Sequence, residues 1–394
     1  MPDPRFASVV DLLESFAAAD PDYSAQLCVY AAGRPVIDHV VGPHSTADSL
    51  TGVFSASKGA AGVVIALLVQ DGLLDPDEPV ATYWPEFAAE GKAAITVGQL
   101  LSHQGGLPGI DGGMGVSDYT DSVAGAVRLA AAPPVWKPGS THQYHALTVG
   151  VFAEELVRRV TGQTLQHLYE TRIRAPFAID FYLGLPEDDE PRYRDVLKPV
   201  QAQQLPFIDP FGPLGLALNS TAGFDVGDGV GHDLLDLPNL RVIRAAGIAA
   251  AGGVANARGL ARLYAAASTG LVHDDGCTSA AVPSGTPAPT DVPAEAPFLT
   301  EETQQQVAAE RVFGIDRANG LTGAFALMFM KSIPRNDFGS WRAFGHDGAN
   351  ATLAFADPAY GIGFGYVPAR AEESGTGSRG GQLTVALRQA LLAG

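Results

Sequence analysis

Segments with the pattern of β-strands lie at the two ends of this 394-residue chain, and the region between them is mainly helical in pattern. Residues 26–31 and 36–41 predict two strands joined by the turn Ala-Gly-Arg-Pro, which indicates a hairpin. Three more strands are predicted near the other end, at residues 326–330, 351–356 and 361–366. We therefore expect an α/β (α+β) fold, in which both ends build one sheet, helices cover its faces and the middle forms an inserted second lobe.

Helical periodicity supports the same division. Thr96 is expected to cap a short helix at 97–102, and a longer helix is predicted from Tyr144 to Thr161, where Gly162 ends it. An almost entirely apolar stretch ending at Leu74 has the length of a buried helix. Further helices are predicted at residues 6–19, 256–268 and 382–392. The predicted domains are an α/β domain of residues 1–78 and 245–394 and a mainly helical domain of residues 79–244, with a pocket where they meet.

Two segments show no periodicity. Residues 185–213 are acidic and rich in proline, and they are expected to form a lid or a wall of a pocket. Residues 274–297 consist mostly of Ala, Pro, Ser, Thr and Asp, and they are expected to form a mobile surface loop.

Charge and composition restrict the partners of this chain. Its formal net charge of −18 disfavours nucleic acid and anionic membranes, so a small-molecule partner is expected. The first residues lack the pattern of a secretory signal, and no apolar run is long enough to span a bilayer, which predicts a cytoplasmic location. Cys28 and Cys277 are expected to be reduced thiols rather than a long-range disulfide. No cluster of residues has metal-ligand spacing, so neither a metal nor another cofactor is expected. The oligomeric state stays open.

The chemistry is expected at Ser55 and Lys58, which lie three residues apart where the most apolar helix begins. This spacing places both side chains on one helix face, about one turn apart. The helix dipole and the apolar neighbours disfavour an ammonium ion, so the pKa of Lys58 is expected to be lowered. A neutral amine within reach of a hydroxyl can activate it as a nucleophile. On the local pattern alone, Ser55 could equally cap the helix beside a solvated lysine.

The wider sequence resembles the superfamily of serine β-lactamases and penicillin-binding proteins, in which Ser-x-x-Lys is a catalytic motif. It is most similar to the family VIII carboxylesterases, which are relatives of the class C β-lactamases. The similarity covers most of the chain and keeps the order of the family's segments. Five segments carry it: Phe-Ser-Ala-Ser-Lys at 54–58, Leu-Leu-Ser-His-Gln-Gly-Gly-Leu-Pro at 100–108, Pro-Gly-Ser followed by a tyrosine at 138–144, Gly-Gly-Val with the helix after it at 252–263, and Gly-His-Asp-Gly at 345–348.

The resemblance implies roles for residues around the serine. Tyr144 would lie opposite Lys58 and exchange protons with Ser55 and the leaving group, helped by a pKa that the neighbouring ammonium lowers. The backbone N–H groups of Ser55 and Ala349 would form the oxyanion hole. His103 is expected to be structural, since Ser-Lys-Tyr chemistry requires no histidine.

The resemblance also implies a substrate pocket at the edge strand of an antiparallel sheet, where His346, Asp347 and Gly348 would lie. β-Lactamases carry Lys-Thr-Gly there, and the lysine pairs with the carboxylate of the antibiotic. Histidine and aspartate remove that cation and add an anion, which disfavours an anionic β-lactam. Tyr144 is followed by His-Ala, so the asparagine that holds the acylamino group is missing, and Ile110 adds an apolar wall. These departures favour small neutral esters.

The leading prediction is a cytoplasmic serine carboxylesterase that forms an acyl-enzyme on Ser55. An amidase, a D-amino-acid peptidase or a weak β-lactamase would use the same chemistry and stays open. A catalytically inactive homologue that binds ligands is disfavoured, because Ser55, Lys58 and Tyr144 are all present. The chain has no Gly-x-Ser-x-Gly motif, which argues against an α/β-hydrolase esterase.

Overall fold

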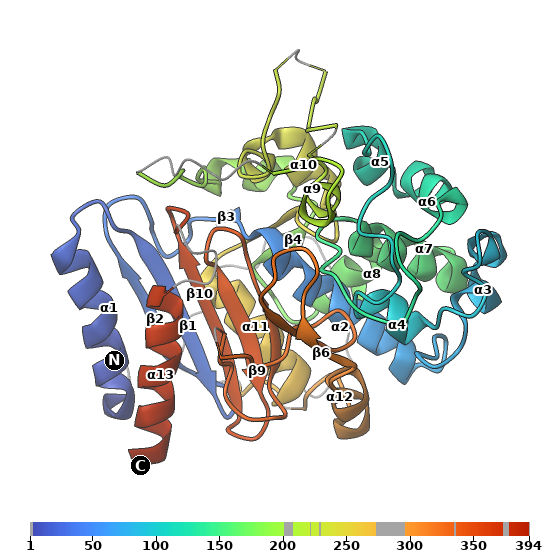
Figure 1. Ribbon diagram of the computed structural model, residues 1–394. Coiled ribbons are helices and arrows are strands. Elements are labelled where there is room, and N and C mark those ends of the chain that lie inside the picture. The colour runs from blue at the N-terminus through green and yellow to red at the C-terminus, as the bar shows by residue number, and fades with distance from the viewer. Residues whose placement is uncertain are drawn as a thin grey trace.

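Both ends of the chain build one five-stranded antiparallel sheet, ordered β2-β1-β10-β9-β8 (Figure 1). The structure is a computed structural model that describes residues 3–200, 208–220, 222–227, 230–272, 296–334, 336–372 and 378–393. The sheet and its covering helices confirm the predicted fold class. The strands are β1 (Ala25–Ala31), β2 (Arg34–Val41), β8 (Phe344–Asp347), β9 (Leu353–Asp357) and β10 (Ile362–Pro368).

Helices cover both faces of this sheet, and a separate group of buried apolar side chains lies on each face. α1 (Ala7–Ala19) and α13 (Ser378–Ala393) lie side by side on one face, and α11 (Ala257–Ser268) packs on the other (Figure 1). α11 approaches β10 closely because the strand has a glycine at the crossing. A Cβ added at Gly365 would lie 2.3 Å from the carbonyl oxygen of Ala257.

The remaining helices form a helical region beside the sheet (Figure 1). Its two long helices, α2 (Ser57–Gln70) and α7 (Thr148–Thr161), pack against each other. The shorter helices are α3 (Val80–Tyr83), α4 (Val97–Leu101), α5 (Val116–Thr120), α6 (Ser122–Ala131), α8 (Leu165–Tyr169), α9 (Pro213–Ala217), α10 (Arg241–Ala246) and α12 (Glu301–Val307). Single turns of tighter or wider helix are η1 (Pro4–Phe6), η2 (Phe54–Ala56), η3 (Pro85–Ala88), η4 (Glu170–Arg174), η5 (Glu187–Arg192) and η6 (Leu237–Asn239).

Two small antiparallel sheets connect these regions. The first joins β3 to β5 and β5 to β4, and the second is a hairpin of β6 and β7. Their strands are β3 (Thr51–Gly52), β4 (Phe181–Leu183), β5 (Gly253–Ala255), β6 (Val312–Ile315) and β7 (Thr322–Phe325). The first small sheet matters for the site, because β3 leads directly into η2 and α2.

The prediction for the start of the long middle helix was wrong, since α7 begins at Thr148 rather than at Tyr144. The N–H of Tyr144 donates to the carboxylate of Asp316 at 2.7 Å, and the N–H of His145 donates to Nδ1 of His103 at 3.1 Å. These tertiary hydrogen bonds replace helical ones, so the chain before Thr148 stays irregular. The predicted end at Gly162 is confirmed, with φ of +73° there.

The predicted strand at residues 326–330 is also wrong. The strand β7 ends at Phe325, and the chain then makes a tight turn in which the N–H of Ala326 donates to the carbonyl of Phe329 at 2.8 Å. Met328 has a positive φ of +66° in this turn. All five residues are buried, so their apolar pattern reflects burial rather than a strand.

The other predicted elements are present with small differences at their ends. The apolar helix ends at Gln70 and not at Leu74, because a turn with φ of +70° at Gly72 follows it. Thr96 caps α4 as predicted, in a reciprocal pair of hydrogen bonds with Gln99. The predicted domain boundaries stay a prediction.

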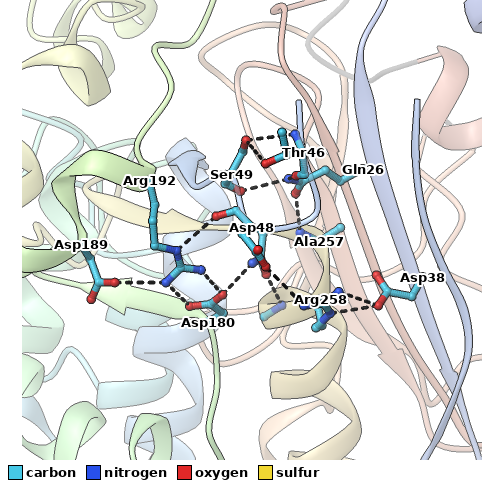
Figure 2. Close-up of polar contacts among 12 residues, drawn as sticks. Gln26, Asp38, Thr46, Asp48, Ser49, Asp180, Asp189, Arg192, Ala257 and Arg258 are labelled. Carbon is cyan, nitrogen blue, oxygen red and sulfur yellow. Dashed lines mark hydrogen bonds and ion pairs between the residues drawn. The ribbon is translucent and has the colours of Figure 1, made fainter. Parts of the chain in front are cut away.

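A polar network fixes the loop between β2 and β3, which precedes the nucleophile segment (Figure 2). Arg192 donates to the carbonyl oxygen of Asp48 at 3.2 Å and to the carboxylate of Asp180 at 3.0 Å. Gln26 of β1 donates to the carbonyl oxygen of Ser49 at 2.9 Å. The loop is therefore held by the helical region on one side and by the main sheet on the other.

Parts of two predicted loops fall outside the described residues. Residues 201–207 of the predicted lid and residues 273–295, including Cys277, are not among them. Cys28 is buried in β1 as a free thiol. The described start of the lid forms η5, and Glu190 there pairs with Arg244 of α10 at 2.7 Å. Among the described helices, none has both the length and the apolar character needed to cross a membrane.

Candidate active site

Ser55 and Lys58 lie where β3 runs into α2, as the sequence predicted. Ser55 is partly exposed in the turn η2, and Lys58 is fully buried one turn further on, with 0% of its surface exposed. Nζ of Lys58 lies 3.0 Å from Oγ of Ser55. Ser57 holds this turn in place, because its hydroxyl donates to the carbonyl of Phe54 and accepts from the N–H of Gly253 at 2.8 Å.

Two backbone carbonyls also bind the amine of Lys58. Nζ donates to the carbonyl oxygen of Ala146 at 2.7 Å and to that of Ala250 at 2.8 Å. Burial lowers the pKa of Lys58 to about 7, against an opposing effect of the nearby Asp347 carboxylate. The amine is therefore about half neutral near pH 7 and largely neutral about one pH unit higher, in agreement with the expected direction of the shift.

Tyr144 lies over the same lysine. Nζ of Lys58 is 4.9 Å from the centre of the Tyr144 ring, and the phenol oxygen is 3.4 Å from Nε2 of His346. Loss of water around the hydroxyl raises the pKa of Tyr144 well above its usual value, although a hydrogen bond with Ser55 lowers it. The expectation of a lowered pKa for this phenol was therefore wrong, because desolvation outweighs the neighbouring groups.

The β6–β7 hairpin supports Tyr144 from behind. The ring of Phe325 stacks on the Tyr144 ring at 5.8 Å with an angle of 19°, and Asp316 accepts the N–H of Tyr144. His103 packs against both rings, 4.9 Å from the Tyr144 ring and 4.5 Å from the Phe325 ring, and its Nδ1 accepts from the N–H of His145. Sequence reasoning missed Asp316 and Phe325, because no local motif joins residues this distant to Tyr144.

His346 and Asp347 lie at the end of the edge strand β8, as predicted, and Gly348 directly follows it. His346 is buried, and its Nδ1 lies 2.8 Å from the carbonyl oxygen of Asp347. Burial, with the nearby Lys58 cation, lowers the pKa of His346 to about 3, so the ring is neutral above pH 4. The Asp347 carboxylate accepts from Asn336 at 2.7 Å, another residue that the sequence did not indicate.

The end of β8 packs against the chain just before the serine. A Cβ added at Gly348 would lie 2.4 Å from the carbonyl oxygen of Val53. Among the described residues, the backbone N–H groups of Ser55 and Ala349 have no hydrogen-bond acceptor. Both groups are therefore available to an external oxygen atom.

Apolar side chains border this position. Phe54 and Ala349 belong to a small apolar cluster, completed by Val196, Leu235 and Ala371. Ile110 is half-buried after α4 and packs against the main core, so its place in a substrate pocket stays a prediction. The described residues contain no group of three side chains that could hold a metal ion.

A buried lysine three residues after a serine, beneath the edge of an antiparallel sheet with an inserted helical region, defines the architecture of the β-lactamases and transpeptidases. The chain belongs to the Beta-lactamase family, whose model matches residues 13–386. This confirms the superfamily that the five sequence segments indicated.

Several named proteins are similar to this chain. The structure of EstA from Arthrobacter nitroguajacolicus Rue61a is similar at a TM-score of 0.90 with 50% identity, covering 100% of this chain and 98% of EstA. A crystal structure of a family VIII carboxylesterase has a TM-score of 0.83 and 27% identity, over 99% of this chain and 98% of that one. The esterase/beta-lactamase LipL from Mycobacterium tuberculosis is 37% identical over 278 residues, 68% of this chain. This match spans 64% of LipL, less than two thirds of its length.

Proposed function

We propose that this protein is a serine carboxylesterase that hydrolyses small neutral esters through an acyl-enzyme on Ser55. The observation that carries the proposal is the set of contacts around Nζ of Lys58, with Ser55 at 3.0 Å and two carbonyl oxygens at 2.7 and 2.8 Å. Relatives named as esterases support a hydrolase of this kind.

The geometry of a neutral amine explains why these three contacts matter. A neutral lysine has two N–H groups and one lone pair. The carbonyls of Ala146 and Ala250 can only accept, so they take both N–H groups. The lone pair is then left for the third neighbour, the hydroxyl of Ser55. Lys58 is thereby oriented as the acceptor of the serine proton.

The reaction follows from these positions. Oγ of Ser55 bonds to the ester carbonyl carbon while its proton passes to Lys58, and the resulting oxyanion binds the N–H groups of Ser55 and Ala349. The C–O bond to the alcohol then breaks. Tyr144 donates its proton to the leaving oxygen and regains one from Lys58. Water next attacks the acyl carbon and gives up a proton to the same groups. The bond between that carbon and Oγ of Ser55 then breaks, and the proton passes to Oγ as the acid leaves.

The substrate class rests on the charges at the pocket edge. His346 is neutral above pH 4, so it supplies no cation for a substrate carboxylate, and Asp347 beside it is an acid. The partly exposed Leu235 and Ala349 of the apolar cluster offer apolar surface to an alkyl or aryl group. These features favour neutral esters over anionic β-lactams. An amidase or D-amino-acid peptidase would use the same groups, and the predicted cytoplasmic location stays a prediction.

Covalent labelling tests the nucleophile. An active-serine phosphonate is expected to label Ser55 in mass spectrometry, and Ser55→Ala is expected to fold, to lose the label and to hydrolyse p-nitrophenyl acetate at less than a few per cent of wild-type kcat. Ser140→Ala changes an exposed serine near Tyr144 and serves as the matched control. A Ser55→Ala variant that keeps its activity would show another nucleophile, and an unlabelled, inactive wild type would favour the inactive binding homologue.

A further inference from the structure

Glu154 is a buried carboxyl group of α7 that the proposed chemistry does not use. Its side chain is 5% exposed, and within the described part of the chain it forms no ion pair. Oε1 accepts from the backbone N–H of Ala249 at 2.9 Å. A carboxyl group is costly to bury, so hydrogen bonds must offset the lost hydration. Its partner Ala249 directly precedes Ala250, whose carbonyl binds Lys58.

Gln166 of α8 adds to this contact, and Ser122 also hydrogen-bonds with Glu154. The Gln166 amide donates to Oε1 of Glu154 at 3.0 Å and to the carbonyl oxygen of Gly247 at 3.2 Å. The short stretch of residues 247–253 is here termed the lysine-contact segment. Glu154 accepts from its Ala249 N–H group, and Gln166 donates to its Gly247 carbonyl oxygen. This segment contains no helix or strand before β5 begins at Gly253, so its position depends on such contacts.

The far end of the lysine-contact segment reaches the serine turn. Ala250 accepts from Nζ of Lys58 at 2.8 Å, and Gly253 donates to Ser57 at 2.8 Å. The segment also lies directly on α7, because a Cβ added at Gly150 would be 2.6 Å from the nitrogen of Ala250. The segment is therefore hydrogen-bonded to Glu154 through Ala249, and to Lys58 and Ser57, which surround Ser55, through Ala250 and Gly253.

We propose that Glu154 is a positioning residue, which holds the Ala250 carbonyl where it directs the lone pair of Lys58 toward Ser55. The inference rests on the proposed function, since it concerns the amine that takes the serine proton. If the carbonyl of Ala250 moves, one N–H of Lys58 loses its acceptor and the amine can rotate. Its lone pair then no longer points at Ser55, and a displacement of about 1 Å in such a group can cost on the order of 10²-fold in rate.

The required property of Glu154 is an acceptor oxygen rather than a negative charge. Burial raises the pKa of Glu154 to about 7, and in either protonation state the carboxyl keeps an oxygen that accepts the Ala249 N–H. A glutamine at this position would keep that oxygen. A methionine of similar length would remove it and leave the N–H of Ala249 without a partner.

Steady-state kinetics with p-nitrophenyl acetate test the proposal. Glu154→Met is expected to lower kcat by about 10- to 100-fold with KM within threefold, because the binding surface is untouched. Glu154→Gln is expected to stay within threefold of wild type. The rate at which a phosphonate labels Ser55 should fall in Glu154→Met and stay near the wild-type rate in Glu154→Gln, because this rate also depends on activation of the Ser55 hydroxyl. Glu155→Gln is the matched control: Glu155 is also buried, but its hydrogen bonds and ion pairs within the described residues go to arginines and not to the lysine-contact segment.

The outcomes separate this inference from the proposed function. If Ser55→Ala is inactive while Glu154→Met keeps kcat within threefold, the positioning role is wrong and the esterase proposal stands. If Ser55→Ala stays active, the proposed function itself fails. Should Glu154→Met not fold, Gln166→Ala replaces it, because that side chain is only partly buried. It is expected to lower kcat several-fold with KM unchanged, and an unchanged kcat in that variant overturns the inference.

Discussion

The hydroxyl of Tyr144 lies 3.4 Å from Nε2 of His346, and the other nitrogen of this imidazole, Nδ1, lies 2.8 Å from a backbone carbonyl oxygen. A carbonyl can only accept, so Nδ1 of the neutral ring carries the proton and Nε2 carries the lone pair. Nε2 is therefore an acceptor within reach of the phenol, which also hydrogen-bonds with Ser55. His346 thus offers a second partner to the hydroxyl of Tyr144 and adds no positive charge to the pocket.

Replacement of His346 tests this contact. His346→Leu removes the acceptor and is expected to lower kcat for p-nitrophenyl acetate roughly three- to tenfold, the worth of one hydrogen bond, with little change in KM. The pKa of His346 is about 3, so the ring does not titrate between pH 5 and 9, and the shape of the pH–rate profile should stay the same. A shift of the acid limb in this variant would mean that His346 itself exchanges the proton.

Tyr144 and Lys58 are expected to act as one unit. Tyr144→Phe should cost on the order of 10²- to 10⁴-fold in kcat, the usual worth of a positioned acid or base. Lys58→Ala should cost at least as much, because it removes the acceptor of the serine proton. Losses within such a unit do not add, so the double variant should be barely worse than either single one. Additive losses, or a Tyr144→Phe enzyme near full activity, would show that other groups transfer the proton. His103 and His346 would then be the first to test.

The lowered pKa of Lys58 predicts an acid limb in the activity. Below its pKa of about 7 the amine is protonated and has no lone pair for Ser55, so kcat/KM should fall about tenfold per pH unit well below that value. Tyr144 keeps its proton far into the alkaline range, since burial raises its pKa well above normal. A profile of kcat/KM against pH for a neutral ester measures the limb, and a flat profile from pH 5 to 8 contradicts the assignment.

The lowered pKa of Lys58 also predicts how the free energy of unfolding changes with pH. Between about pH 7 and 10.5 the unfolded chain binds a proton at Lys58 and the folded chain does not, so the free energy of unfolding should rise with pH in this window. Lys58→Met has no such group. The stability of wild type relative to Lys58→Met should therefore increase by up to about 1.4 kcal/mol per pH unit between these limits and stay level below pH 6. Urea unfolding of both proteins at pH 6, 8 and 9.5 measures the difference, and a constant difference would show that Lys58 keeps an ordinary pKa.

Much of the fold could be predicted from the sequence, because its signals are local. The turn residues between two strand-like segments indicated β1 and β2, and Gly162 marked the end of α7. The wrong predictions of secondary structure concern segments whose conformation is set by tertiary contacts. Residues 326–330 have the apolar pattern of a strand, but they form a buried turn that brings Met330 beside Gly345 of the edge strand. No local pattern separates these two structures.

The same distinction applies to the candidate site. The spacing of Ser55 and Lys58 and the motif around His346 are visible in the sequence. The groups that set their geometry are the carbonyls of Ala146 and Ala250, and a backbone carbonyl leaves no trace in residue type. The direction of the Tyr144 pKa shift was missed for a related reason, since desolvation depends on packing from distant parts of the chain.

The charge at the edge of the pocket leads to a last prediction, on substrate selectivity. With a neutral His346 and the carboxylate of Asp347 in place of a fixed cation, kcat/KM for p-nitrophenyl acetate should far exceed that for the anionic β-lactam nitrocefin. Asp347→Asn removes the negative charge and should raise kcat/KM for nitrocefin by a few-fold, while the neutral ester changes little above pH 8. Ester hydrolysis changes little above pH 8 because Lys58 is already mostly neutral there. The Asp347 carboxylate raises the pKa of Lys58, so removing its charge only increases the neutral fraction of the amine. Comparable kcat/KM values for the two substrates in the wild type would overturn the assignment to neutral esters. A nitrocefin rate that Asp347→Asn leaves unchanged would show that the missing cation, and not the added anion, excludes β-lactams.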